Sequence, residues 1–188
     1  MELSTSDAPA AAMIWTVGHS TRGLEDFLGL LGKFRTEALA DVRSFPGSRK
    51  YPQYGKEALA ATLKSRAIEY RWLRELGGRR RASPNSPNTE WRNAAFRGYA
   101  DHMSTAEFAR GLRQLLELAS EARTVIMCAE ALWWRCHRSM IADALCVRGV
   151  EVVHIIDARR ETVHPMTSAA HIVRGELSYG GPNTTASS

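Results

Sequence analysis

Short apolar runs alternate along the chain with amphipathic stretches whose apolar residues recur every three or four positions. The runs predict strands at residues 13–17, 38–42, 68–73, 124–128 and 150–156. The amphipathic stretches predict helices from Leu24 to Leu31, over 54–66, from Phe108 to Leu116 with Ser104 as N-cap, and over 137–148, the last ending at Gly149. Strands that alternate with helices form βαβ units. We therefore expect an α/β fold: a mostly parallel, Rossmann-like sheet flanked by helices.

The pattern predicts one domain, residues 13–174, between two tails. Residues 1–12 are rich in Ala, Ser and Pro and are expected to be disordered, and residues 175–188, rich in Gly, Asn, Thr and Ser, to be flexible. Residues 77–97 interrupt the alternation and predict a long basic inserted loop. Loops of this length in compact domains are usually functional or disordered.

Composition narrows the class of protein. The chain has 188 residues, of which 44% are hydrophobic and 24% charged, which is typical of a folded globular domain. No apolar run approaches the roughly 20 residues that span a bilayer, and the first twelve residues lack the basic charge of a signal peptide. Three cysteines cannot all pair within one chain, so we expect a reducing, cytoplasmic location and no membrane segment.

The net charge of +5 is unevenly distributed. Residues 43–97 hold 13 basic and 4 acidic residues, a net charge of +9, so the remainder of the chain carries −4. This segregation indicates a basic surface that faces an anionic partner. The same segment interleaves arginines with aromatic residues, as in proteins that bind single-stranded nucleic acid, although core packing produces the same pattern. These aromatic residues are Tyr51, Tyr54, Tyr70, Trp72, Trp91 and Phe96.

Polar side chains follow four of the predicted strands. In open α/β sheets, ligands bind outside the carboxyl ends of the strands, which lie at one edge. The residues in question are His19, Ser20 and Arg22; Asp41, Arg43, Ser48 and Arg49; Cys128 and Glu130; and His154 and Asp157. We expect them to form a functional site at this edge.

Several of these residues lie in segments that resemble a known family. The segments are VGHSTR, ADVRSFPGSRKYPQY, Leu76-Gly77-Gly78, FRGYA at 96–100 and CAEALWWRCHRSMIADAL at 128–145. In this order they resemble the family called domain of unknown function 488 (DUF488), over residues 13–157. The resemblance implies a single α/β domain in which these motifs are grouped together, and it implies no particular reaction.

The segment from Cys128 to Arg138 contains the most reactive residue types. Cys-based phosphatases place an Arg six residues after the nucleophilic Cys, but position 134 is Trp and Arg135 comes one residue late. We therefore do not expect a phosphate loop. Cys136 and His137 open a predicted helix, whose N-terminus favours a thiolate and binds anions.

Two interpretations of that helix start remain open. In the functional interpretation, Cys136 is reactive, or an anion binds the first-turn N–H groups beside Arg135 and Arg138. In the structural interpretation, Cys136 is a small buried residue and His137 is a packing or capping residue. Cys146 is expected in the core. Trp133 and Trp134 are candidates for a stacking wall.

A zinc site is the remaining chemical possibility for the Cys and His residues. Cys128, Cys136, His137 and His19 have suitable ligand atoms. None has the short Cys-x2-Cys or His-x3-His spacing of common zinc sites, and adjacent residues such as Cys136 and His137 tend to point apart. We expect no metal site, and no cofactor is indicated.

Four further residues are candidates for the site. His19 is a candidate acid or base, or else bonds a neighbouring loop carbonyl. Asp41 and Arg43 alternate along an extended segment, and we expect their side chains on opposite sides. Either Arg43 faces the ligand while Asp41 orients a neighbouring loop, or the reverse. Glu130 is a candidate general base or an ion-pair partner of an arginine.

These observations support two hypotheses. In the first, the protein is an enzyme for a phosphate-bearing, nucleotide-like or nucleic-acid substrate. Its catalytic residues are His19, Glu130, Cys136 and His137. Its anion-binding and substrate-binding residues are Ser20, Arg22, Asp41, Arg43, Ser48, Arg49, Cys128, Trp133, Trp134, Arg135 and Arg138. In the second, it is a non-catalytic module that binds a nucleotide or nucleic acid through residues 43–97.

Overall fold

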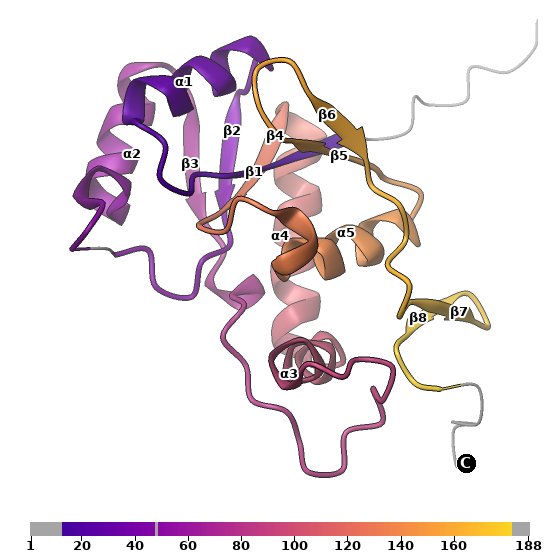
Figure 1. Ribbon diagram of the computed structural model, residues 1–188. Helices are drawn as coiled ribbons and strands as arrows, with labels where there is room; N and C mark the ends of the chain where they lie inside the picture. The colour runs from indigo at the N-terminus through magenta and orange to yellow at the C-terminus, as the bar shows by residue number, and fades with distance from the viewer. Residues whose placement is uncertain (1–12, 48, 182–188) are drawn as a thin grey trace, which may run out of the picture.

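A mixed six-stranded sheet forms the centre of the molecule (Figure 1). The computed structural model describes residues 13–47 and 49–181. The strands are β1 (Met13–Gly18), β2 (Ala38–Asp41), β3 (Glu69–Trp72), β4 (Thr124–Cys128), β5 (Glu151–Ile155) and β6 (Glu161–Val163). Their order is β3-β2-β4-β1-β5-β6; β1 to β5 are parallel, and β6 is antiparallel to β5. The predicted α/β fold with a mostly parallel sheet is confirmed.

Five helices cover the two faces of this sheet. They are α1 (Leu24–Lys33), α2 (Lys56–Ser65), α3 (Ala94–Met103), α4 (Ala106–Glu121) and α5 (Arg138–Cys146). Apolar residues of α1 and α2 pack with alternate strand residues such as Val125 and Met127, whereas those of α3, α4 and α5 pack with Ile126 and Cys128. Because strand side chains alternate between faces, β1, β2, β4 and β5 each contribute to both cores. Cys128 therefore points to the α4 and α5 side.

The topology opens a crevice beside the end of β4. This strand lies between β2 and β1, whose following helices, α2 and α1, cover one face of the sheet, while α5, which follows β4, covers the other. The chain thus leaves neighbouring strands toward opposite faces, which is where open α/β sheets bind ligands.

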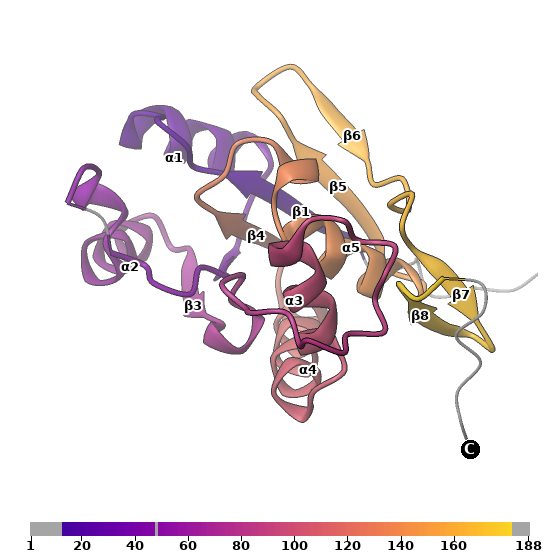
Figure 2. The ribbon, with the colours of Figure 1, turned by 60° about the horizontal axis from the view of Figure 1, so that its bottom comes forward.

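The segment before α4 differs from the sequence prediction. Helix α3 begins at Ala94, inside the predicted loop 77–97, with Asn93 as N-cap accepting a hydrogen bond from the Ala95 amide at 2.8 Å. The N-cap of α4 is Thr105, which accepts from the Phe108 amide at 3.2 Å, so the prediction of Ser104 was wrong by one residue. Figure 2 shows α3 and the segment that precedes it lying over the side of the sheet covered by α4 and α5.

At the carboxyl end of the chain, a hairpin of β7 (His171–Val173) and β8 (Glu176–Ser178) follows the sheet. Tyr179 is 3% exposed, so the part of the predicted tail up to residue 181 contains β8 and a core residue. The predicted tail 1–12 and residues 182–188 lie outside the described residues. No helix within 13–47 and 49–181 is long and apolar enough to cross a bilayer.

Candidate active site

A cavity of about 540 Å³ lies at the crevice between β2 and β4. Segments distant in the sequence form its walls: the residues after β2 and β4, the Gly78–Arg79 turn, α3 and the residues before α5. Its lining comprises Arg43, Ser44, Phe45, Gly78, Arg79, Asn93, Ala95, Phe96, Tyr99, Cys128, Ala129, Glu130, Arg135, Cys136 and His137. Six of the residues predicted for the site thus meet in one cavity.

Three potential ligand atoms converge on one wall of this cavity. The sulfurs of Cys128 and Cys136 and a ring nitrogen of His137 all lie within 4.8 Å of one another. The Cys136 sulfur is 3.6 Å from His137 Nδ1. Both cysteines are buried and free, and Cys128 is the last residue of β4. We refer to these three residues as the cysteine–histidine cluster.

The expectation of no metal site depended partly on the directions of the Cys136 and His137 side chains, and the structure differs on those directions. Cys136 and His137 were expected to point apart, but their side chains lie together. Residues 129–135 form a loop that returns the chain to the end of β4, so Cys128 and Cys136 meet although their spacing is not a usual zinc spacing. Two thiols and an imidazole are ligand types that zinc prefers.

The orientation of the His137 ring follows from its two neighbours. Its Nε2 atom lies 3.0 Å from the carbonyl oxygen of Val42, which only accepts, so Nε2 carries the proton and donates. The Nδ1 atom therefore faces the Cys136 sulfur. Gly78 permits this placement, because a Cβ atom there would meet His137 Nδ1 at 2.3 Å. This close approach explains Gly78, whereas a Cβ at Gly77 would meet the Ser44 hydroxyl oxygen at 2.7 Å.

Arg138 lies directly behind the cluster. It is 1% exposed and donates through Nε to the Cys136 sulfur at 3.5 Å. Its other donors reach the Thr16 hydroxyl at 3.4 Å and the carbonyl oxygens of Glu130 and Ala131. Within the described chain, no carboxylate forms an ion pair with this guanidinium. Arg138, predicted to bind an external anion, points into the protein interior instead.

These groups decide the ionisation of the two thiols. Burial opposes ionisation of Cys136, but a hydrogen bond from Cys128 and the charges of His137 and Arg138 lower the pKa of its thiol well below the usual value. The same hydrogen bond, together with burial, raises the pKa of Cys128 well above its usual value. When no cation is bound, Cys136 therefore loses its proton more readily, and Cys128 keeps its proton.

A chain of buried hydrogen bonds leads from Arg138 to a distant carboxylate. Thr16 Oγ1 lies 2.7 Å from His154 Nδ1, and His154 Nε2 lies 2.9 Å from His164 Nδ1. His164 Nε2 in turn donates to Asp143 Oδ1 at 2.9 Å. Because Arg138 only donates and Asp143 only accepts, every bond in this chain points toward Asp143. Burial, with the charges of His164 and Arg138, lowers the pKa of His154 to about 3.

Asp143, the carboxylate at the end of this series of hydrogen bonds, has several further partners. Asp143 is fully buried and also accepts from the amide and hydroxyl of Thr167 and from the hydroxyl of Tyr179, at 2.7 to 2.9 Å. Trp133 stacks on His154 with ring centres 4.2 Å apart, and so contributes to this interior network and not to the cavity. Sequence reasoning missed the network, because its members are scattered along the chain and none stands in a recognisable motif.

The charge of Arg43, in contrast, is neutralised by the adjacent carboxylate of Asp41. Its Nε and Nη2 atoms donate to the two carboxylate oxygens of Asp41 at 2.8 and 2.5 Å, and Nη2 also donates to the Tyr54 carbonyl. The prediction that Asp41 and Arg43 face opposite sides was wrong, because residues two positions apart along an extended segment point to the same side. Tyr70 donates to the same carboxylate at 2.7 Å.

His19 has no free ring nitrogen. Its Nδ1 donates to the Ser20 carbonyl at 3.0 Å, and its Nε2 accepts from Arg43 at 3.4 Å. The ring stacks on Tyr54 with centres 4.1 Å apart. Burial and the charge of Arg43 lower the pKa of His19 to about 4, so the ring is neutral near pH 7. This geometry matches the interpretation of His19 as a ring bonded to a loop carbonyl.

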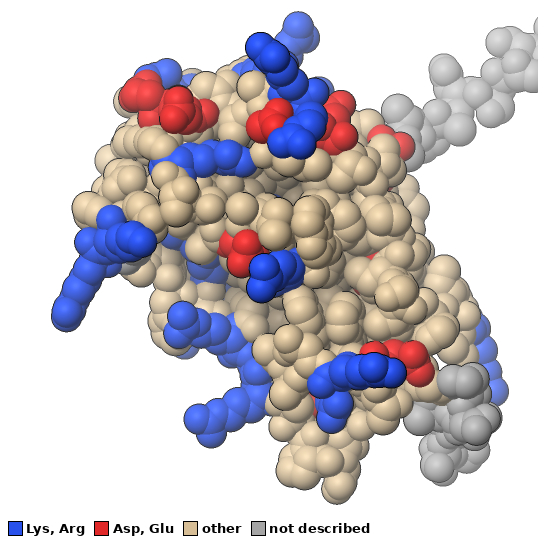
Figure 3. All heavy atoms as spheres, in the orientation of Figure 1, with Lys and Arg blue, Asp and Glu red and all other residues tan. Residues whose placement is uncertain are grey.

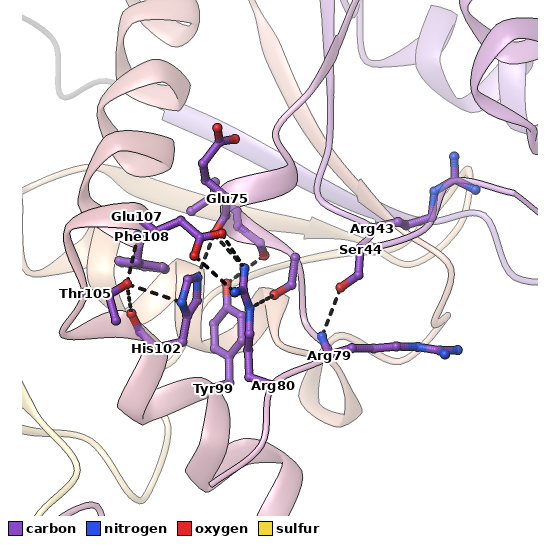
Figure 4. A network of polar contacts seen from close by, with 12 residues as sticks. Arg43, Ser44, Glu75, Arg79, Arg80, Tyr99, His102, Thr105, Glu107 and Phe108 are labelled. Carbon is purple, nitrogen blue, oxygen red and sulfur yellow. Dashed lines mark hydrogen bonds and ion pairs between the residues drawn. The ribbon is translucent and has the colours of Figure 1, made fainter. Parts of the chain in front are cut away.

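The basic run at 79–81 divides into different roles (Figure 4). Arg80 pairs with Glu107 of α4 at 3.1 Å and donates to the Gly77 carbonyl, which anchors the turn. The Arg79 amide donates to the Ser44 hydroxyl at 3.0 Å, while its side chain extends away from the Arg80–Glu107 pair toward the cavity. Arg79 is exposed, and no ion pair of its guanidinium occurs among the described residues.

On the opposite rim, Arg135 and Glu130 are both exposed. The Glu130 carboxylate accepts from the Leu132 amide at 3.1 Å. Arg135 forms no ion pair in the described part of the chain. Phe96 of α3 provides an aromatic wall of the cavity, and Tyr99, which also lines it, is fully buried. The cavity thus combines unpaired cationic groups with an apolar surface.

The remaining predicted residues lie outside the cavity lining. Ser20 has a left-handed backbone (φ 48°), and Arg22 donates to the carbonyls of Gly18 and Ile156, so both shape the turn after β1. Arg49 is exposed, Trp134 is 51% exposed, and Ser48 lies outside the described residues. Gly18 is fixed by packing, because a Cβ there would meet the Glu130 carbonyl oxygen at 2.0 Å.

Other cavity residues were not predicted as site residues. Ser44, Phe45, Gly78, Arg79, Asn93, Ala95, Phe96, Tyr99 and Ala129 belong to this group. Two signals pointed to some of them: the motifs at 76–78 and 96–100, and the basic run beginning at Arg79.

Comparison with known proteins bears on the motifs. The family described as "Domain of unknown function DUF488" matches residues 23–145, a range that includes β4, the cysteine–histidine cluster and all but the end of α5. The resemblance predicted from the motifs is thereby confirmed. Searches of the curated proteins and of the solved structures give no match.

Proposed function

We propose that this chain, which belongs to the DUF488 family, is an enzyme that holds a small anionic, nucleotide-like substrate in the cavity between β2 and β4. The observation that carries the proposal is the meeting of three groups in one cavity: the cysteine–histidine cluster, the unpaired Arg79 and Arg135, and the aromatic wall. Plain electrostatic binding needs neither thiols nor an imidazole at its floor.

The division of labour follows from exposure and charge. Arg79 and Arg135 are placed to bind the anionic group, because a guanidinium matches phosphate and carboxylate oxygens with two parallel donors. Phe96 offers a surface for an apolar or aromatic part of the substrate. The reacting atom then lies against the cysteine–histidine cluster, with Glu130 the acidic residue among those that line the cavity.

The alternative is a nucleic-acid-binding module, and its support is the net charge of +9 in residues 43–97. Four arginines of that segment, however, pair with carboxylates: Arg43, Arg66, Arg71 and Arg80. Figure 3 shows the basic side chains in several separate groups on this face, with acidic side chains between them. Tyr54 is fully buried, and Trp72 donates to the Arg43 carbonyl. The footprint is therefore smaller than the sequence suggests, which favours a small substrate.

Ligand binding tests the proposal. We expect mononucleotides to bind the full chain in calorimetric titrations, and Arg79→Ala and Arg135→Ala each to weaken binding by about tenfold, since a charge-assisted contact contributes about 1.5–3 kcal/mol when desolvated and less at an exposed rim. Arg113→Ala, on the exposed face of α4, is the matched control and should leave affinity unchanged.

Two results would count against an enzyme. The first is tight binding of a single-stranded oligonucleotide with no mononucleotide affinity, since it favours the nucleic-acid-binding module. The second is that every mononucleotide that binds is recovered unchanged, as read by mass spectrometry, after long incubation with the wild-type protein.

A further inference from the structure

The geometry assigns a zinc site to Cys128, Cys136 and His137, with the fourth coordination position open to the cavity. This inference rests on the proposed function and gives it a reaction centre. The chemical class is a single Zn²⁺ bound by two thiolates and one imidazole, the ligand set of a catalytic rather than a structural site, because three protein ligands leave one position for water or substrate.

The spacing of the ligand atoms fits a tetrahedral ion. With Zn–S near 2.3 Å and Zn–N near 2.0–2.1 Å, tetrahedral ligands lie roughly 3.5–3.8 Å apart. Cys136 Sγ and His137 Nδ1 already lie 3.6 Å apart, and no pair in the cluster exceeds 4.8 Å. Small side-chain rotations therefore complete the geometry, without movement of β4 or α5.

The surroundings of His137 are those of a metal ligand. A ligating imidazole usually donates its other ring N–H to a carbonyl or carboxylate, which holds the lone pair toward the metal. His137 donates through Nε2 to the Val42 carbonyl at 3.0 Å and turns Nδ1 toward the sulfurs. Gly78 leaves the space beside Nδ1 open, where any larger residue would place its Cβ.

The charges around Cys136 and Cys128 are compatible with a bound cation. Two adjacent buried thiolates repel each other, and Arg138 supplies one positive charge behind Cys136. A divalent cation balances both thiolates and lets the Cys128 proton leave. The N–H···S contact from Arg138 then acts as the outer hydrogen bond that holds a ligating sulfur in place.

Cavity access gives such a zinc ion a role in hydrolysis. Cys128, Cys136 and His137 all line the cavity, so a water on the fourth position faces the substrate. Glu130, the acidic residue of the same lining, would take one proton from such a water as the water oxygen bonds the electrophilic atom of the substrate. It would then return the proton to the leaving group, so that one water is added and no oxidant or reductant is needed.

Metal content of the full chain tests the inference. Protein prepared with reductant and without a histidine tag is stripped with chelator, equilibrated with zinc salt, and measured by elemental mass spectrometry. We expect one zinc per chain. Replacement by cobalt should give thiolate-to-cobalt charge-transfer absorption and the intense visible bands of tetrahedral cobalt.

Matched variants place the site. Cys128→Ser and Cys136→Ser should lose the charge-transfer absorption in part and the zinc affinity by more than tenfold, whereas Cys146→Ser, on α5 but outside the cluster, should behave as wild type. Gly78→Ala keeps all three ligands and should still weaken zinc by displacing His137; Gly47→Ala, with nothing within 4 Å of its added Cβ, is its control.

A measurement on the wild-type protein tests the zinc site even where a variant fails to fold. Zinc should protect Cys128 and Cys136, but not Cys146, from alkylation, as read by peptide mass spectrometry. Absence of zinc uptake by reduced, folded protein, or equal protection of all three cysteines, overturns the site. Nucleotide binding by metal-free protein without zinc uptake overturns the zinc site and leaves the proposed function standing; zinc uptake without ligand binding does the reverse.

Discussion

Two arginines at the carboxyl edge of the sheet, Arg43 and Arg138, are both buried, with 6% and 1% of their surfaces exposed, yet they differ in what balances their charge. Arg43 forms a two-pronged pair with Asp41. Arg138 donates to a sulfur, a hydroxyl and carbonyl oxygens, and it reaches a carboxylate, Asp143, only through intervening hydrogen bonds.

The difference separates structural from chemical roles. A guanidinium that is neutralised by its neighbour holds the loop after β2 in place and has little attraction left for a ligand. A guanidinium without an adjacent carboxylate stabilises negative charge at the nearest polarizable atom, here the Cys136 sulfur. Both residues follow polar strand ends in the sequence, and only their partners tell them apart.

The largest expected effect is at the neutralised pair. Asp41→Asn leaves Arg43 buried and unpaired, and should lower the free energy of unfolding by about 3–5 kcal/mol in urea denaturation. Asp41→Asn combined with Arg43→Met should recover part of that loss, because no unpaired charge remains. A loss below about 1 kcal/mol for the single variant would contradict the pairing.

A smaller loss is expected for the remote carboxylate. Asp143→Asn should lower the free energy of unfolding by about 1.5–3 kcal/mol, since it weakens charge-assisted hydrogen bonds from Tyr179, Thr167 and His164. Glu25→Gln, in an exposed pair, is the control. If Asp143→Asn costs as much as Asp41→Asn, the distinction between direct and relayed neutralisation fails.

Acid should destabilise both regions through their histidines. His19 and His154 have pKa values lowered to about 4 and about 3, against about 6.5 in the unfolded chain. The unfolded state binds more protons in this range, so their contribution is complete above pH 6.5 and is lost as pH falls toward the folded values. Between pH 6.5 and 5.5, each should cost about 1 kcal/mol.

Single replacements test which histidines cause this pH dependence of the unfolding free energy. His19→Gln and His154→Gln should each remove about 1 kcal/mol of the change in unfolding free energy measured by urea denaturation across pH 6.5 to 5.5, whereas His171→Gln, at an exposed position, should leave it unchanged. An unaltered slope in both variants would show that neither ring is buried in its neutral form.

The smallest effect should come from a surface pair. Arg66 and Glu25 form an ion pair at 3.2 Å with side chains 53% and 80% exposed. Arg66→Ala should change the free energy of unfolding by less than about 1 kcal/mol, because solvent screens exposed charges. Thermal unfolding at low and high salt provides the measurement. A salt-dependent loss of unfolding free energy comparable to that of Asp41→Asn would show that burial does not decide the strength of these ion pairs.

Part of the candidate site followed from local pattern. The strand ends that carry Cys128 and Arg43 were identified because apolar runs mark parallel strands, and their carboxyl ends necessarily share an edge. Helix α3 was missed, since Asn93 to Met103 follows a stretch rich in Pro, Asn and Ser that resembles a loop.

What the sequence by itself determined is the α/β fold, the edge at which chemistry-bearing residues gather, and the family. These depend on apolar periodicity and on ordered motifs, both of which are local properties. The tertiary structure decided which of those residues are consumed by internal partners and which face a cavity. Asp41 neutralises Arg43, Cys128 meets Cys136 and His137, and Asp143 joins His164 because segments distant in sequence pack together, and side-chain partners across such distances are set by packing that no local pattern encodes.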